Sequence, residues 1–113
     1  MTASDSKYKL CLTTVNDHST AKAIAQKLLQ QKLVACVNIS NQMSSMYHWQ
    51  GDIVEEVEFL MLMKTSSQKV TELQATLLQL HPYDVPEFIC LNIDDGAPDY
   101  IDWIGSSISS TPC

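Results

Sequence analysis

The chain has 113 residues, which is enough for one domain with a modest core. Its composition, 45% hydrophobic and 18% charged, is typical of a folded globular protein and argues against a disordered one. The formal net charge of −6 at pH 7, with only seven basic residues, argues against a nucleic-acid partner, because phosphate binding requires clustered Lys and Arg side chains.

The first third of the chain predicts a strand, a helix and a second strand. Residues 8–15 are rich in β-forming types and indicate a largely buried strand. Asp17 is the expected N-cap of a helix, whose apolar face recurs at three- and four-residue spacing from Ala21 to Leu29. Residues 33–39 are apolar at almost every position, which predicts a central strand covered on both faces.

The middle of the chain predicts a long β-hairpin. The polar residues 40–42 interrupt the apolar pattern and indicate a kink or bulge. Residues 43–49 and 53–64 then predict two strands joined by a turn at 50–52. The tip of this hairpin carries large side chains, namely Met46, Tyr47 and Trp49.

The last third predicts a helix, a rigid connector, a short strand and a final helix. Ser66 or Ser67 can cap a helix with an apolar stripe from Val70 to Leu80. Pro82 and Pro86 make residues 81–87 a stiff, extended segment, since each removes a backbone donor and excludes its predecessor from the α region. Residues 88–93 predict a strand, Pro98 suits the first turn of a helix, and residues 106–113 are expected to fray.

The order β-α-β-β-α-β with a C-terminal helix predicts an α+β fold of the ferredoxin-like type, with helices on one face of an antiparallel sheet. We expect one domain over residues 8–108, a disordered tail over 1–7 and a C-terminal tail over 109–113. The hairpin and the strand at 33–39 also carry apolar residues for the other sheet face, more than a monomer usually exposes. Self-association is the simplest way to remove this apolar surface from water.

The cysteines and the N-terminus favour a reducing cytosol. No apolar run approaches the roughly 18 residues that span a bilayer, and residues 1–6 lack the apolar segment of a signal peptide. Cys11, Cys36 and Cys90 lie in apolar runs without zinc spacing, which predicts buried, reduced thiols. Cys113 at the end of the chain is expected to be exposed.

The connector is the first candidate site, because it holds His81, Asp84 and Glu87 with little backbone freedom. Imidazole and carboxylate ligands suit borderline ions such as Cu(II) or Zn(II). Three interpretations stay open: a structural strut with Tyr83 packed at a subunit boundary, a weak metal site, and a cleft for an organic ligand.

Other candidate groups have a simpler structural interpretation. Met43, Met46 and His48 could attract Cu(I), but methionines beside aromatics usually serve packing. The acidic run Glu55, Glu56 and Glu58, with Asp52, lacks the spacing of a calcium loop and is better explained as a solvated strand face. No nucleophile elbow or glycine-rich phosphate loop occurs, so we expect neither an enzyme nor an organic cofactor.

Several blocks of the sequence resemble the CutA family of divalent-ion tolerance proteins, over almost all of residues 8–108. The blocks are residues 35–38, 44–51, 64–65, 81–87 and 99–103. The resemblance implies a tight homotrimer of ferredoxin-like subunits, with hairpins that complete sheets across interfaces. It also implies a link to copper and other divalent ions. As trimer contacts we expect Met46, Tyr47, Trp49, Tyr83 and Trp103.

The resemblance implies a copper site made by a first-strand Cys, a His at the start of the connector and its closing Glu. Glu87 matches the Glu, whereas Thr13 and Leu80 stand at the Cys and His positions. The neighbouring residues Cys11 and His81 are the candidate replacements. The expected metal ligands, for Cu(II) or another divalent cation, are therefore His81, Glu87, Asp84 and Cys11.

We therefore expect a cytosolic, trimeric binding protein concerned with divalent metal tolerance. A first alternative is a signalling module that binds a small anionic ligand between subunits, as trimeric nitrogen-regulatory PII proteins do. It would need Lys9, Lys32 or Lys64 at the cleft. A second alternative is a structural scaffold that presents its hairpin or termini to another protein.

Overall fold

The computed structural model describes residues 6–109, as five strands and three α-helices. The strands are β1 (Tyr8–Val15), β2 (Cys36–Ile39), β3 (Met43–Trp49), β4 (Asp52–Ser66) and β5 (Ile89–Ile93). The α-helices are α1 (His18–Gln30), α2 (Val70–Leu80) and α3 (Pro98–Ser107), and a 3₁₀ turn (Ser67–Lys69) precedes α2. Among the described residues, no helix is long and apolar enough to cross a membrane. Most of the predicted tails, 1–7 and 109–113, lies outside residues 6–109.

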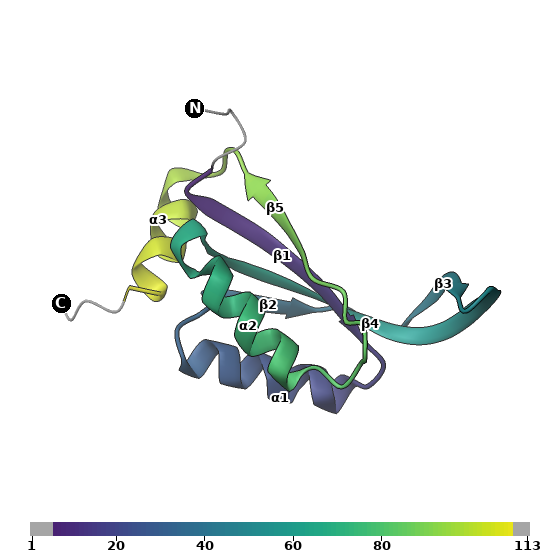
Figure 1. Ribbon diagram of the computed structural model, residues 1–113. Coiled ribbons are helices and arrows are strands. Elements are labelled where there is room, and N and C mark those ends of the chain that lie inside the picture. Colours follow the sequence, from purple (N-terminus) through teal and green to yellow (C-terminus); the bar gives the residue numbers. More distant parts are fainter. Residues whose placement is uncertain (1–5, 110–113) are drawn as a thin grey trace.

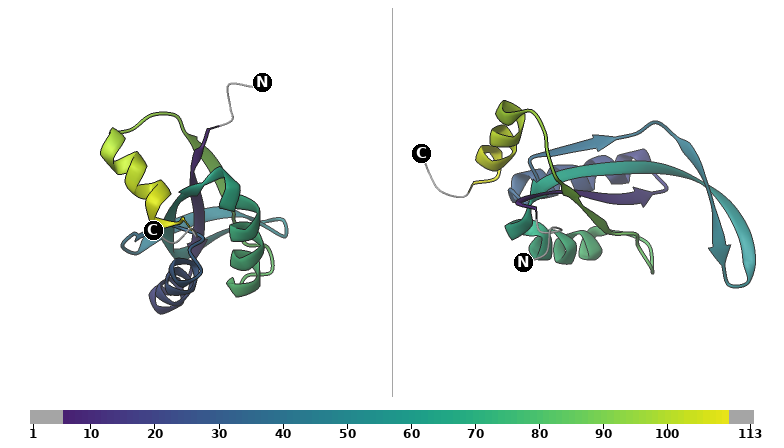
Figure 2. Two further views of the ribbon diagram at one scale, coloured as in Figure 1. Left: turned by 90° about the vertical axis from the view of Figure 1, so that its left-hand side faces the viewer. Right: turned by 90° about the horizontal axis from the view of Figure 1, so that it is seen from above.

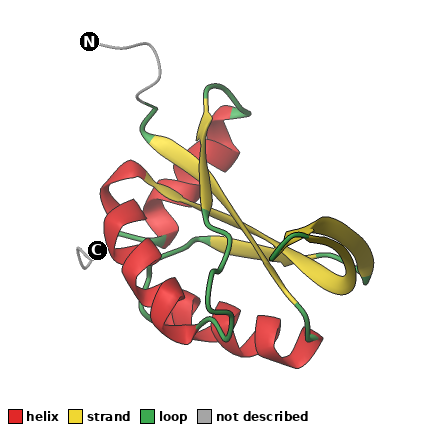
Figure 3. Ribbon diagram, turned by 45° about the vertical axis from the view of Figure 1, so that its right-hand side comes forward, coloured by secondary structure: helices red, strands yellow, loops and turns green. Residues whose placement is uncertain are grey.

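The strands form one antiparallel sheet in the order β2-β4-β1-β5, and β3 pairs with the outer half of β4. Helices α1 and α2 lie together against one face of this sheet (Figures 1 and 3). Alternate residues of β1 and β4 point into that layer, and Cys11, Val15, Met61 and Met63 are fully buried there. The predicted α+β fold, with its antiparallel sheet and three helices, is confirmed.

The helix boundaries follow local chemistry in two of three cases. Asp17 caps α1 as predicted, since its carboxylate accepts a hydrogen bond from the Thr20 backbone N–H at 3.0 Å. Pro98 occupies the first turn of α3. The capping prediction for α2 was wrong, because Ser66 precedes the 3₁₀ turn and makes no side-chain cap hydrogen bond, and α2 begins only at Val70.

The prediction of a central strand over residues 33–39 was also wrong. The strand β2 covers only Cys36–Ile39 and lies at one end of the strand order, paired with β4 alone. Leu33 and Val34 are buried, but they lie in the connection after α1 and fill the core from there. The apolar run in the sequence is therefore longer than the strand, because Leu33 and Val34 are buried outside it.

The β3–β4 hairpin protrudes from the body of the domain. The fifteen-residue β4 continues beyond the sheet and curves away with β3, as Figure 2 shows from above. The chain measures 49 Å along its longest axis, and its Cα radius of gyration is 15.1 Å. A compact domain of this length would have a radius of gyration of about 13 Å.

The sheet face opposite α1 and α2 is only partly covered. Side chains on this open face alternate with the core residues of the same strands, and they are Leu10, Leu12, Leu62, Ile89 and Leu91. Helix α3 covers one end, where the Lys64 ammonium donates to the Tyr100 hydroxyl at 3.0 Å. Ile89 and Leu91 stay 45% exposed.

The cysteines differ in burial, against the prediction that all three within the apolar runs are buried. Cys11 is fully buried, Cys36 is half-buried and Cys90 is exposed, and all three are free thiols. Cys90 is exposed because β5 lies at the end of the strand order, so its outer side has no neighbouring strand. Cys113 lies outside the described residues.

Candidate functional site

A cavity of about 790 Å³ lies between the hairpin and the connector that follows α2. From the hairpin, the lining includes Met46, Tyr47, His48 and Trp49, and from the connector it includes Tyr83, Asp84 and Glu87. The remaining lining residues are Thr14, Asn16, Met43, Ser45, Val54, Glu56, Glu58 and Val85. The fold thus brings the polar connector and the hairpin to one place, although they are distant in sequence.

Tyr83 and Glu58 form the central polar contact of this cavity. The Tyr83 hydroxyl donates to Glu58 Oε2 at 2.7 Å, and Glu58 is only 6% exposed. Burial, followed by this hydrogen bond and the charge of Glu58, raises the pKa of Tyr83 well above its ordinary value, so the phenol stays protonated. The prediction that Glu58 belongs to a solvated strand face was therefore wrong.

The charged side chains that line the cavity are acidic. Glu56, Glu58, Asp84 and Glu87 are all part of the lining, and none of the described lining residues is a lysine. Burial and the neighbouring Glu56 raise the pKa of Tyr47, as expected in a negative environment. Such a surface attracts cations and repels anions.

The lysines that an anionic ligand would need lie elsewhere. Lys9 donates to the Asn92 side chain, which lies opposite it on β5. Lys64 binds Asn38 and Tyr100 on the open face, at 3.1 and 3.0 Å. Lys32 lies in the turn after α1, and none of the three lines the cavity.

His81 is buried beside the cavity and uses both ring nitrogens within the chain. Its Nε2 is 2.9 Å from the Thr14 carbonyl oxygen, and its Nδ1 accepts from the Tyr83 backbone N–H at 3.2 Å. Since a carbonyl only accepts, Nε2 carries the proton. This pairing attaches the connector to β1. A metal ion bound to His81 would have to displace one of the two hydrogen bonds.

Cys11 and Thr13 lie in the helix-covered core rather than in the cavity lining. Burial and the neighbouring Cys90 raise the pKa of the Cys11 thiol to about 12. The Thr13 hydroxyl is buried and has no hydrogen-bond partner among the described residues. The structure therefore brings Asp84 and Glu87 into the cavity lining, but not His81 or Cys11.

The donor set is suited to a divalent cation, but one chain does not assemble a complete site. The cavity offers carboxylate oxygens, the imidazole of His48 and thioethers, a mixture that borderline ions accept. No three His, Cys, Asp or Glu side chains within residues 6–109 gather closely enough to hold a metal ion. Tight sites use three or four convergent ligands, so this arrangement is consistent only with weak binding by a single chain.

Four of the five predicted interface residues are available for contact, whereas the fifth, Tyr83, is half-buried and hydrogen-bonded to Glu58. Met46 is 68% exposed, Trp49 and Trp103 are each 43% exposed, and Tyr47 is 37% exposed. Trp103 stacks on Tyr100 in α3, far along the chain from the hairpin, with ring centroids 5.5 Å apart. Exposed aromatics of this kind are common anchors of protein interfaces.

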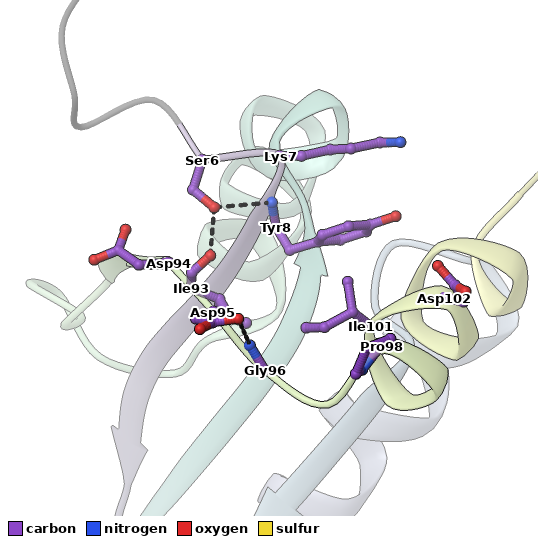
Figure 4. Close-up of a pocket in the computed structure, with 10 residues that line it drawn as sticks. All are labelled: Ser6, Lys7, Tyr8, Ile93, Asp94, Asp95, Gly96, Pro98, Ile101 and Asp102. Atoms are coloured by element: carbon purple, nitrogen blue, oxygen red, sulfur yellow. Dashed lines mark hydrogen bonds between the residues drawn. The ribbon is translucent and has the colours of Figure 1, made fainter.

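A second hollow, of about 690 Å³, lies between the N-terminal end of β1 and the start of α3 (Figure 4). Asp94 and Asp102 lie on opposite sides of it, and Asp95 accepts from the Gly96 backbone N–H at 2.8 Å. Because these carboxylates do not converge, this hollow does not resemble a cation site.

Comparison with known proteins identifies relatives along nearly the whole chain. The family described as CutA1 divalent ion tolerance protein matches residues 9–107. The divalent-cation tolerance protein CutA of Thermus thermophilus is 41% identical over 96 residues, which cover 85% of this chain and 93% of that protein. The structure of CutA from Xylella fastidiosa superposes with a TM-score of 0.89 at 36% identity, covering 92% of this chain and all of that one. A periplasmic divalent cation tolerance protein CutA from Archaeoglobus fulgidus superposes with a TM-score of 0.87 at 32% identity, covering 90% and 99%.

Proposed function

Because this chain belongs to the CutA1 divalent ion tolerance protein family, we propose that it is a cytosolic homotrimer that acts in tolerance of divalent metal ions, copper among them. In this proposal each ion binds weakly at a cleft between subunits. The observation that carries the proposal is the acidic cavity between hairpin and connector, lined by Glu56, Glu58, Asp84 and Glu87.

The chemistry of the cavity supports a cation rather than an anion as the ligand. Four carboxylates in the lining create a negative potential, and the lysines that could reverse it lie elsewhere. Oxygen and imidazole donors suit Cu(II) or Zn(II). Because fewer than three strong ligands gather in one chain, within its described part, a neighbouring subunit would complete the coordination.

The shape of the subunit supports assembly. The hairpin extends beyond the compact body, and its exposed apolar side chains include Met46, Trp49, Ile53 and Val57. The open sheet face adds Ile89 and Leu91. Three copies could cover these surfaces reciprocally and enclose the cavity at the base of each hairpin.

A binding role without catalysis is consistent with the family's name, which refers to ion tolerance and not to a reaction. A cytosolic location is consistent with the free thiols of Cys11, Cys36 and Cys90. Since one structural relative is described as periplasmic, cell fractionation is the direct test of location.

Calorimetric titration with Cu²⁺ tests the proposed site. We expect the double variant Glu56→Gln, Glu87→Gln to bind Cu²⁺ at least about tenfold more weakly than the unchanged protein, since two charged ligands of the cavity become neutral. Both substitutions keep the size of the side chain and therefore its packing.

The matched control is Glu55→Gln, which removes the same charge from the adjacent residue of β4. Glu55 is not part of the cavity lining, whereas Val54 and Glu56 on either side of it are. We expect its Cu²⁺ affinity to stay close to that of the unchanged protein. Equal heats from the double variant and the control would remove this cavity from consideration.

A further inference from the structure

Two thiols face each other across neighbouring strands. Cys11 of β1 and Cys90 of β5 are direct partners in the antiparallel register, so their side chains lie on the same face of the sheet. The proximity of Cys90 is one of the causes, after burial, of the raised pKa of Cys11. Cys11 is fully buried and Cys90 is exposed, so the pair reaches from the core to the surface.

The register satisfies the geometric requirement of a disulfide. Directly opposite residues of antiparallel strands have Cα atoms about 4.5 or 5.5 Å apart, depending on the type of pair. Disulfides usually join residues whose Cα atoms are about 4.4–6.8 Å apart. Both types of pair fall within that range, so Cys11 and Cys90 can be joined without a change of register.

We propose that Cys11 and Cys90 form a thiol–disulfide exchange site that small-molecule disulfides such as oxidised glutathione convert into a cross-strand disulfide. The exposed Cys90 thiolate attacks one sulfur of oxidised glutathione, and a mixed disulfide forms as one glutathione thiolate leaves. The Cys11 sulfur then attacks the Cys90 sulfur, and its proton passes to the departing glutathione thiolate, so that the second glutathione leaves as a thiol. The two protein thiols are oxidised, and one oxidised glutathione is reduced to two glutathione molecules.

The surroundings of the pair favour this sequence of steps. Only Cys90 is accessible to a dissolved disulfide, because Cys11 has no exposed surface. Burial raises the pKa of Cys11, and the Lys9 ammonium on the same sheet face opposes part of this rise. Once Cys90 is in a mixed disulfide it can no longer become a thiolate, so its charge no longer opposes ionisation of Cys11.

The disulfide would tie β5 to the centre of the sheet. Strand β5 lies at the end of the strand order and follows the connector that carries Asp84 and Glu87. It also presents Ile89 and Leu91 on the open face. Oxidation would therefore restrain the segment that joins the cavity to the exposed apolar surface, whereas in a reducing environment the pair stays a dithiol.

Peptide mass mapping of the folded full-length protein tests the proposal. We would incubate the Cys113→Ser chain with oxidised glutathione, block the remaining thiols with N-ethylmaleimide and digest with trypsin. The change at Cys113 is needed because no lysine follows Lys69, so one tryptic peptide contains both Cys90 and Cys113. The expected result is a linked pair of peptides, 10–22 and 70–113, with the mass of two hydrogens lost.

Two variants distinguish disulfide formation between Cys11 and Cys90 from the reaction of a single exposed thiol. With Cys11→Ser, glutathione attached to Cys90 should accumulate, because the second thiol is missing. With Cys36→Ser, the link should form as before, since Cys36 faces Lys64 on the other side of the sheet. A stable glutathione adduct on Cys90 while Cys11 is intact would overturn the proposal. Modification of Cys11 and Cys90 by N-ethylmaleimide to the same extent as Cys36 would also overturn it, because it would show that no disulfide had formed.

Discussion

At the scale of single residues, the Tyr83–Glu58 hydrogen bond connects the connector to β4 and closes one wall of the cavity. The donor is a half-buried phenol, and the acceptor is a carboxylate that is almost completely buried. A hydrogen bond to a buried charge contributes about 1.5–3 kcal/mol, because its loss leaves the charge without a partner. The contact should therefore affect both stability and its dependence on pH.

We expect Tyr83→Phe to lower the free energy of unfolding by about 1.5–3 kcal/mol at neutral pH. The pKa of Tyr83 is raised by burial and by Glu58, so above pH 10 the folded state retains a proton that the unfolded chain has lost. The stabilisation is therefore fully present below about pH 10 and is lost as the pH rises through the folded-state pKa. Urea unfolding at pH 8 and pH 11, at equal protein concentration, measures both effects.

In this experiment the unchanged protein should lose more stability between the two pH values than Tyr83→Phe does. The two proteins differ in their ionisable groups only at Tyr83, so the difference reports the titration of Tyr83 together with its electrostatic coupling to Tyr47. Parallel pH dependences would show that the phenol is not held protonated by its environment.

Residue-level patterns predicted only part of the cavity lining. Of the four predicted ligands, Asp84 and Glu87 line the cavity, whereas His81 and Cys11 do not. Tyr83, which was predicted as a trimer contact, also belongs to the lining. Glu58 was missed as a site residue, because its partner is 25 residues away in sequence and alternation alone places it at the surface. A buried acceptor becomes apparent only when the curvature of β4 brings Tyr83 to it.

At the scale of elements, the break between β2 and β3 depends on a serine side chain. The Ser40 backbone N–H donates to the Leu60 carbonyl at 2.9 Å, and the Leu60 N–H donates to Ser40 Oγ at 2.8 Å. The hydroxyl thus replaces a backbone acceptor of the interrupted ladder. The sequence predicted a kink at residues 40–42 from polarity alone, and the structure provides its hydrogen-bonding mechanism.

We expect Ser40→Ala to destabilise the protein by about 1 kcal/mol, since the Leu60 N–H loses its acceptor at a partly buried position. Ser44→Ala is the matched control, because Ser44 is an exposed residue of β3. Chemical denaturation of both variants at one protein concentration provides the comparison. Equal stability of the two variants would mean that water replaces the hydroxyl without cost.

Periodicity and caps predicted most elements, and tertiary context explains the failures. The helix with the Asp17 cap and the helix with Pro98 in its first turn were both predicted from short-range signals. The position of β2 was not, since Leu33 and Val34 are buried by packing against the core and not by flanking strands. An apolar run indicates that its residues are buried, but it does not show whether strands or helices cover them.

At the scale of the whole molecule, the protruding hairpin and the open sheet face both expose apolar side chains to water. The radius of gyration of 15.1 Å exceeds that of a compact domain by about 2 Å, because the hairpin extends away from the core. An extended apolar arm costs free energy in water unless another surface covers it. The homotrimer proposed above would provide that cover.

Leu91→Glu tests whether the open face is buried by assembly. Leu91 is 45% exposed in the single chain, so a carboxylate there should be tolerated by the subunit but not by a buried interface. Leu78→Glu is the matched control, because Leu78 is 42% exposed on α2, which packs against the opposite sheet face. Light scattering after size-exclusion chromatography should give three times the 12.6 kDa chain mass for the unchanged protein and for Leu78→Glu. Leu91→Glu should shift the mass towards that of one chain, and a monomeric unchanged protein at micromolar concentration would refute the proposed assembly.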